Sequence, residues 1–143
     1  MLLMDIELEG EIEFEKLEGH WAWWWPGRAL VLFGDALEED TRLRLEDDEA
    51  GPKGQRWDPW SESYAKTRGP QHKLLFSTGA LADSFAFDRS GDVLDFGSPL
   101  PYARVHQTGS RDGRLPKREY VGISPELSNA LDGIFPADFE RGL

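Results

Sequence analysis

His106 is the side chain best suited to proton chemistry in this sequence, because an imidazole gains and loses a proton near neutral pH. It lies four residues after Tyr102 and beside Gln107, with Asp95 and Asp112 nearby in the sequence. A histidine with a carboxylate and a hydroxyl could serve a small hydrolase. No Gly-x-Ser-x-Gly run and no cysteine supplies the nucleophile that such an enzyme needs. We therefore expect His106 to pack its ring against an aromatic neighbour and to bond a backbone carbonyl.

The other residue types that hold metals or cofactors are absent or unsuitably spaced. His20 and His72 lie in unrelated segments, and no His-Glu-x-x-His pair is present for zinc. The glycines form neither a phosphate-binding loop nor a dinucleotide fingerprint, and the carboxylates show no recognisable catalytic spacing. The absence of cysteine excludes disulfides and thiolate metal sites. We expect no catalytic residue, no metal and no cofactor, and so a scaffold rather than an enzyme.

Length and composition favour one soluble domain over residues 1–143. A chain of 143 residues with 39% hydrophobic and 30% charged residues can bury a core of its own. No apolar run approaches the roughly 20 residues that span a bilayer, and no signal peptide is recognisable. We therefore expect no membrane contact and synthesis in a reducing cytoplasm.

The negative charge is confined to the first third of the chain. Residues 1–50 carry 15 acidic and 4 basic side chains, whereas residues 51–143 carry 12 of each. A free-standing DNA-binding protein usually has the opposite balance, because phosphate contacts need Lys and Arg. The excess is either a solvated surface that keeps the protein soluble or a surface that recognises a partner.

The first half of the chain predicts a strand followed by a long helix. Apolar and acidic residues alternate from Met4, which predicts a strand over residues 4–10 and, less clearly, over 11–18. Tryptophans at 21, 23, 24 and 25 cannot all face one core, so they form either an aromatic plug or a contact with another chain. A helix is predicted from Pro26 to about Asp48, because Leu30, Phe33, Leu37 and Thr41 recur at three- and four-residue steps. Its charged residues are expected on the far side of the helix: Glu38, Glu39, Asp40, Arg42 and Arg44.

The second half predicts short elements joined by loops. Glycines and prolines make residues 49–73 an extended, mobile loop, in which Trp57 pins the chain onto the domain. We expect a short helix over 71–81, a hairpin of strands 84–87 and 92–96 with Gly91 in its turn, and a strand over 118–123. Ser124 and Pro125 then begin a last helix that Pro136 ends. The fold class is α+β, with a small antiparallel or mixed β-sheet packed against a long amphipathic helix, an extended loop and a C-terminal helix.

A second charge feature lies in the loop at residues 108–117 and its flanks. Between residues 104 and 118 the only acidic side chain is Asp112, against the cations Arg104, Arg111, Arg114, Lys117 and Arg118. The segment could contact nucleic acid phosphates, the acidic first third of a neighbouring copy, or only solvent.

Three motifs in fixed order resemble the phage virion morphogenesis family, which includes the tail-completion proteins of Mu-like phages. They are Thr-Gly-x-Leu-x-x-Ser at 78–84, Tyr-Ala-x-x-His-Gln-x-Gly at 102–109, and a segment at 116–122. In that last segment Glu119 replaces the second proline of the family pattern Pro-Ala-Arg-Pro-Phe-Leu-Gly, and Tyr120 takes the aromatic position. The resemblance covers residues 29–124. It assigns no active site, and it implies roles in shaping the sheet, its turn and a subunit contact for Trp57, Thr78, Gly79, Leu81, Ser84, Gly97, Tyr102, Ala103, Arg104, His106, Gln107, Gly109, Arg111, Arg114, Pro116, Arg118, Tyr120 and Gly122.

The resemblance implies a structural protein of the virion, assembled in the host cytoplasm. Such proteins lie at the neck or the head-proximal end of the tail, next to neck, connector or tail-tube proteins, and commonly form rings, often of six subunits. DNA would only pass through the channel. In a ring the acidic region 1–50 of one subunit could dock on the basic loop of the next. Two alternatives remain open: an acidic phage-encoded binding module that mimics DNA or inhibits a host protein, and the hydrolase centred on His106.

Overall fold

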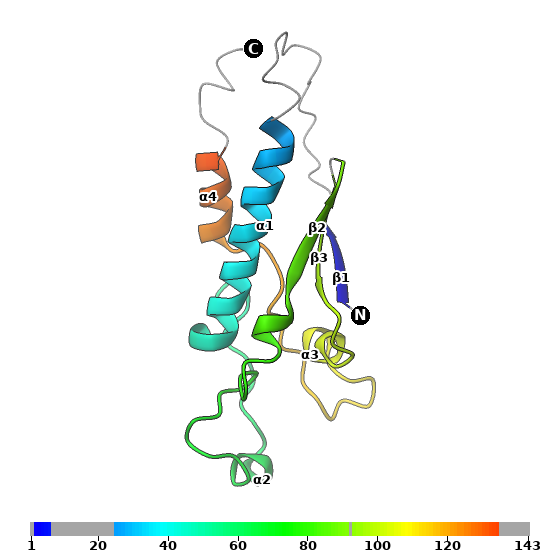
Figure 1. Cartoon of the computed structure of the whole chain (residues 1–143). Helices are drawn as coiled ribbons and strands as arrows, with labels where there is room; N and C mark the ends of the chain where they lie inside the picture. The colour runs from blue at the N-terminus through cyan, green and yellow to red at the C-terminus, as the bar shows by residue number, and fades with distance from the viewer. Residues whose placement is uncertain (1, 7–24, 92, 135–143) are drawn as a thin grey trace.

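The chain forms a three-stranded antiparallel sheet with helices packed on one side (Figure 1). The computed structural model describes the backbone of residues 2–6, 25–91 and 93–134. Along the chain the elements are β1 (Leu2–Ile6), α1 (Trp25–Leu43), the π-helical turn η2 (Arg44–Asp48), α2 (Glu62–Ala65), the 3-10 turn η3 (Ala82–Ser84), β2 (Ala86–Ser90), β3 (Val93–Ser98), α3 (Ala103–Thr108) and α4 (Pro125–Ile134). Figure 1 shows α1 between the sheet and α4. The predicted α+β class is confirmed.

Helix α1 forms because its apolar residues repeat at helical spacing and face the sheet. Leu30, Phe33, Leu37 and Thr41 are all buried, whereas Asp35 and Glu39 on the other side are exposed. The helix continues into η2 and ends at Glu49, which adopts a left-handed conformation with φ of 49°. The helix predicted over residues 26–48 is confirmed.

The sheet has the order β1-β3-β2, so β3 is its central strand. Leu2 pairs with Ser98 on one side, and Ala86 pairs with Gly97 on the other. Gly91, with φ of 62°, lies in the turn between β2 and β3, as the hairpin prediction required. The predicted first strand is confirmed over residues 4–6, while residues 7–18 and Trp21 to Trp24 lie outside the described part of the chain.

Aromatic rings fill the space between α1 and the sheet. Phe85 stacks on Phe96 with ring centroids 5.4 Å apart and meets Tyr120 edge-on at 5.6 Å. Gly34 lets the sheet approach the helix, since a Cβ atom at that position would lie 2.5 Å from the ring of Phe87. The core therefore requires residues from α1, the hairpin and the 118–124 segment together.

Two predicted elements are wrong. Residues 71–81 form turns rather than a helix: Lys73 N donates to Phe76 O, and Gly79 has φ of 82°, which no right-handed helix accommodates. Residues 118–123 are extended but join no sheet, because side chains rather than a neighbouring strand bond their backbone. The loop over 49–73 is irregular as predicted, apart from the short helix α2, and its mobility stays a prediction.

The C-terminal helix begins where the sequence predicts. Ser124 Oγ accepts a hydrogen bond from Leu127 N at 3.0 Å, which caps α4, and donates to Asp40 Oδ1 at 3.1 Å, which ties α4 to α1. Leu127 is buried against the core. Phe135 and Pro136, the expected end of this helix, lie outside the described residues. Within the part of the chain that is described, no helix is both long and apolar enough to cross a membrane.

Replacing Ser124 with Ala should lower the free energy of unfolding by about 1–2 kcal/mol, because the cap and the bond to Asp40 are lost together. Urea unfolding followed by far-ultraviolet circular dichroism measures the change. Ser128→Ala, on an exposed position of the same helix, should change the value by less than about 0.5 kcal/mol. Equal effects of the two substitutions would contradict the capping role.

Candidate functional site

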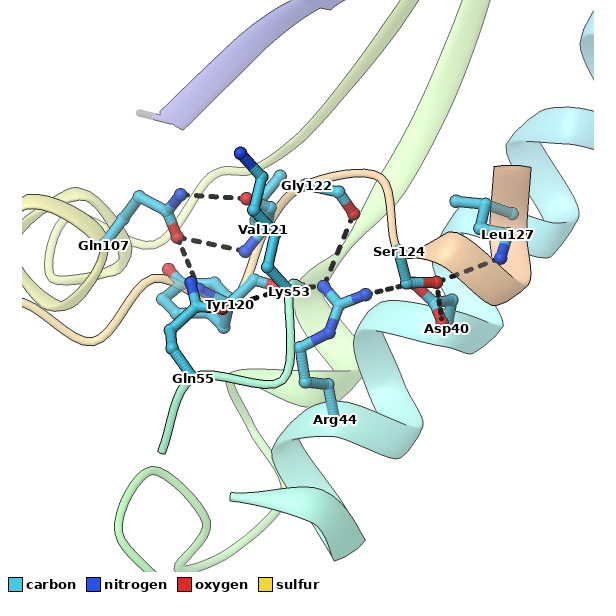
Figure 2. A network of polar contacts seen from close by, with 10 residues as sticks. All are labelled: Asp40, Arg44, Lys53, Gln55, Gln107, Tyr120, Val121, Gly122, Ser124 and Leu127. Carbon is cyan, nitrogen blue, oxygen red and sulfur yellow. Dashed lines mark hydrogen bonds and ion pairs between the residues drawn. The ribbon is translucent and has the colours of Figure 1, made fainter. Parts of the chain in front are cut away.

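Some of the residues singled out from the sequence, Gln107, Tyr120 and Gly122, meet at the extended segment 118–124 (Figure 2). This segment runs between α1, α3 and the loop that follows η2, and it pairs with no strand. Tyr120 and Val121 are buried, so their backbone groups need partners inside the protein. Side chains from distant parts of the sequence supply those partners.

Gln107 takes the place of a neighbouring strand. Its Oε1 accepts hydrogen bonds from Tyr120 N at 2.9 Å and Val121 N at 3.0 Å, and its Nε2 donates to Val121 O at 3.0 Å. Gln107 lies on α3. The backbone carbonyl of His106, the residue before it, accepts a hydrogen bond from Arg118 N at 2.9 Å. Helix α3 thus holds the segment by bonds that a sheet would otherwise provide.

Arg44 holds the same segment from the opposite side. Its guanidinium is buried and donates to Tyr120 O, to Gly122 O and to the carboxylate of Asp40 one helical turn earlier. Burial lowers the pKa of Arg44, and the charge of Asp40 opposes that shift. Gly122 is required here because a Cβ atom would lie 2.6 Å from the ring of Pro52.

The remaining bonds fasten the long loop to the segment. Trp57 Nε1 donates to Glu119 O at 2.9 Å, so this tryptophan pins the loop as predicted. Arg118 is only 4% exposed, and its Nε and Nη2 donate to Asp58 O at 3.0 and 2.8 Å. Tyr120 donates its hydroxyl to Ala103 O at 2.6 Å, and burial raises the pKa of that phenol well above its ordinary value.

The other motif residues lie in the β2–β3 hairpin, in the turns before it or beside the loop at residues 108–117. Ser84 and Ser98 are joined through their hydroxyls at 2.6 Å, and Leu81 beside them is buried. Gly97 lies in β3, paired with both neighbouring strands. Gly109 has φ of 80°, and a Cβ atom there would lie 3.1 Å from Lys117 N. Pro116 is half-buried nearby, whereas Thr78 is exposed.

His106 behaves only partly as predicted. Its ring meets that of Tyr102 edge-on, with centroids 6.0 Å apart, which confirms the aromatic contact. Its Nδ1 is buried with no hydrogen-bond partner, so the expected bond from the imidazole to a carbonyl is wrong. Burial, and then the charge of Arg118, lowers the pKa of His106. A neutral ring packed on Tyr102 fits a structural position.

The predicted basic loop offers fewer available cations than the sequence suggests. Arg118 is committed to the interior, Arg114 pairs with Asp112 at 3.3 Å, and Lys117 pairs with Glu119 at 3.0 Å. Asp112 also accepts a bond from Ser110, which lowers its pKa and gives the loop a defined turn. Arg104 and Arg111 stay exposed. The loop alone is therefore a weaker anion-binding surface than the charge count predicted.

The sequence pattern predicts Asp40 and Arg44 on the far side of the helix and assigns Ser124 only as a helix cap. The far-side placement is wrong for Arg44, which is 3% exposed. A usable pattern was present: Arg44 falls on the apolar stripe of α1 and η2, and Asp40 precedes it by four residues. A buried cation needs such a partner. Across the described residues no group of His, Asp and Glu could hold a metal ion. The arrangement fixes the backbone geometry of the segment.

Comparison with known proteins agrees with the resemblance noted in the sequence. A model of the phage virion morphogenesis family matches residues 27–140. A protein of Escherichia phage Mu, named as capsid assembly protein G, is 31% identical to this chain over 98 residues. That match covers 62% of this chain and 63% of the Mu protein, so the chain spans less than two thirds of the length of that relative. No solved structure matches the chain.

Replacing Arg44 with Leu should lower the free energy of unfolding by about 3–5 kcal/mol, because Asp40 and two carbonyls lose their partner. Urea unfolding monitored by tryptophan fluorescence gives the value. The matched control is Arg42→Leu, two positions away, which removes an exposed pair with Asp83 and should cost less than about 1 kcal/mol. An Arg44→Leu variant as stable as the control would contradict the network.

The lowered pKa of His106 predicts a pH-dependent contribution to stability. The folded state binds the proton more weakly than the unfolded state, so stability falls as pH drops below about 6.5 toward the folded-state pKa. His106→Asn should lose less stability than the parent between pH 7 and 5, measured by urea midpoints at both pH values. A nuclear magnetic resonance titration of the imidazole supplies the control, and a His106 pKa above the model-peptide value would refute the explanation.

Proposed function

Because the chain belongs to the phage virion morphogenesis family, we propose that it is a structural protein of the neck or the head-proximal tail end. It completes the tail and enables the head to join by forming an oligomeric ring. The family and the Mu relative support a role in phage assembly. The ring, its position in the particle and its neighbours, which would be neck, connector or tail-tube proteins, are the parts proposed here.

The separation of charge between α1 with η2 and the loop that follows them carries the proposal. Residues 25–49, which form α1, η2 and the cap residue Glu49, hold eight acidic and three basic side chains, whereas residues 50–73 hold two acidic and five basic ones. Figure 1 shows the loop carrying α2 projecting beyond the C-terminal end of α1. Unlike charges on two surfaces of one subunit favour head-to-tail contacts between copies, and such contacts close into rings when the rotation between copies permits.

The use of the motif residues supports a scaffold rather than an enzyme. Gln107, Arg118 and Tyr120 are occupied with backbone bonds, and His106 has no nucleophile among its described contacts. A protein with this arrangement presents a rigid shape with two charged surfaces. In a ring, such subunits would leave a central passage for DNA without binding its bases.

Purified protein should form a closed oligomer at low ionic strength and dissociate as salt rises, because the Debye length falls to about 10 Å at 0.1 M salt. Size-exclusion chromatography with light scattering at low and high salt measures the mass, and negative-stain electron microscopy shows whether the particles are rings. Assembly that is insensitive to salt would contradict electrostatic docking. A monomer at every salt and protein concentration would contradict the ring and favour the acidic binding module.

Deletion of the gene from the phage genome that carries it tests the position in the particle. The expected lysate contains filled heads and separate tails, and plasmid-encoded protein restores joined particles. Normal joined particles in the deletion would overturn the assignment to the junction.

A further inference from the structure

A groove lies between the loop that carries α2 and helix α3. Trp60, Tyr64 and Arg68 contribute from the loop, residues 72–81 from its return, and Tyr102 and His106 from α3. The cavity volume is about 190 Å³. None of the lining residues is acidic, although the chain contains 27 Asp and Glu residues. The groove is therefore suited to an anionic occupant.

The walls of the groove combine aromatic rings with cations. Trp60 meets Tyr64 edge-on at 5.8 Å, and the Arg68 guanidinium lies 4.5 Å above the Tyr64 ring. Tyr64 and Tyr102 are each 43% exposed, which leaves large apolar faces in solvent. Tyr, Trp and Arg are the residues enriched at the centres of protein interfaces.

A face on α1 has the complementary composition. On the outer side of α1, Leu32 and Leu43 are 40% and 44% exposed, and the acidic Asp35 and Glu39 lie between them at helical spacing. Two cations that follow on the helix are committed elsewhere, because Arg42 pairs with Asp83 and Arg44 is buried. The exposed leucines of α1 are complementary to the aromatic rings of the groove, and the carboxylates of α1 are complementary to Arg68.

We infer that the groove receives the outer face of α1 from a second copy of this chain, with Asp35 and Glu39 facing Arg68 and the exposed leucines facing Tyr64 and Tyr102. The inference rests on the proposed ring and names its contact surfaces. The two surfaces are different and do not overlap, so each subunit can use both at once and the contact repeats from copy to copy. A phosphate group would meet the cations but leave the exposed leucines of α1 uncovered.

Disulfide cross-linking tests the pairing directly, since the chain contains no cysteine of its own. Thr78 at the groove and Glu39 on α1 are both exposed. Under mild oxidation the double variant Thr78→Cys with Glu39→Cys should give a ladder of covalent multimers. An equal mixture of the two single variants should give covalent dimers that contain one of each. The control, Thr78→Cys with Ser90→Cys on the exposed end of β2, should give no ladder.

Charge reversal supplies an independent measurement. Arg68→Glu or Glu39→Arg should weaken self-association about tenfold, and the double reversal should restore it, because every contact regains an opposite pair. Arg89→Glu, an exposed reversal in β2, should leave association unchanged. Circular dichroism confirms that each variant keeps its helical content.

The outcomes separate this inference from the proposed function. Normal rings without a ladder, and without an effect of Arg68→Glu, would overturn the groove contact and leave the ring intact. A wild-type chain that stays monomeric at high protein concentration and low salt would overturn both. A ladder together with rescue by the double reversal would establish the pair of surfaces.

Discussion

The buried backbone of residues 118–124 is the constraint on which the rest of the structure depends. Tyr120 and Val121 lie in the interior without a strand beside them, so their N–H and C=O groups require other partners. Gln107 and Arg44 provide these partners from opposite sides. Because unpaired buried groups cost about 1–3 kcal/mol each, the segment can occupy this position only when both side chains are in place.

This constraint joins elements that the sheet alone leaves separate. Arg44 connects the segment to α1, Gln107 connects it to α3, and Trp57 connects it to the long loop. Ser124 then continues the chain into α4 while bonding Asp40. The α2 loop and α3 are thereby held in place relative to α1. Such rigidity would suit the proposed ring, in which two contact surfaces must keep one angle from copy to copy.

Elements with a strong local pattern were predictable from the sequence. Helix α1, the hairpin around Gly91 and the capped start of α4 follow from helical spacing, a turn glycine and the Ser124-Pro125 pair, and all are confirmed. The predicted helix over 71–81 and strand over 118–123 are wrong, because both segments take their shape from distant partners. The subunit-contact role of the motif residues stays a prediction, and the sequence could not tell which cations of the basic loop are bound and which are exposed.

The sequence by itself determined the period of each regular element, the division of charge and the lack of a catalytic motif, since these depend on neighbouring residues and on composition. Only the tertiary structure decided that Arg118 is buried while Arg68 is exposed beside a groove free of carboxylates. It also decided that Gln107 replaces a strand. The physical reason is that burial and hydrogen-bond partners arise from residues 13 to 76 positions apart along the chain, and their proximity is set by packing rather than by local pattern.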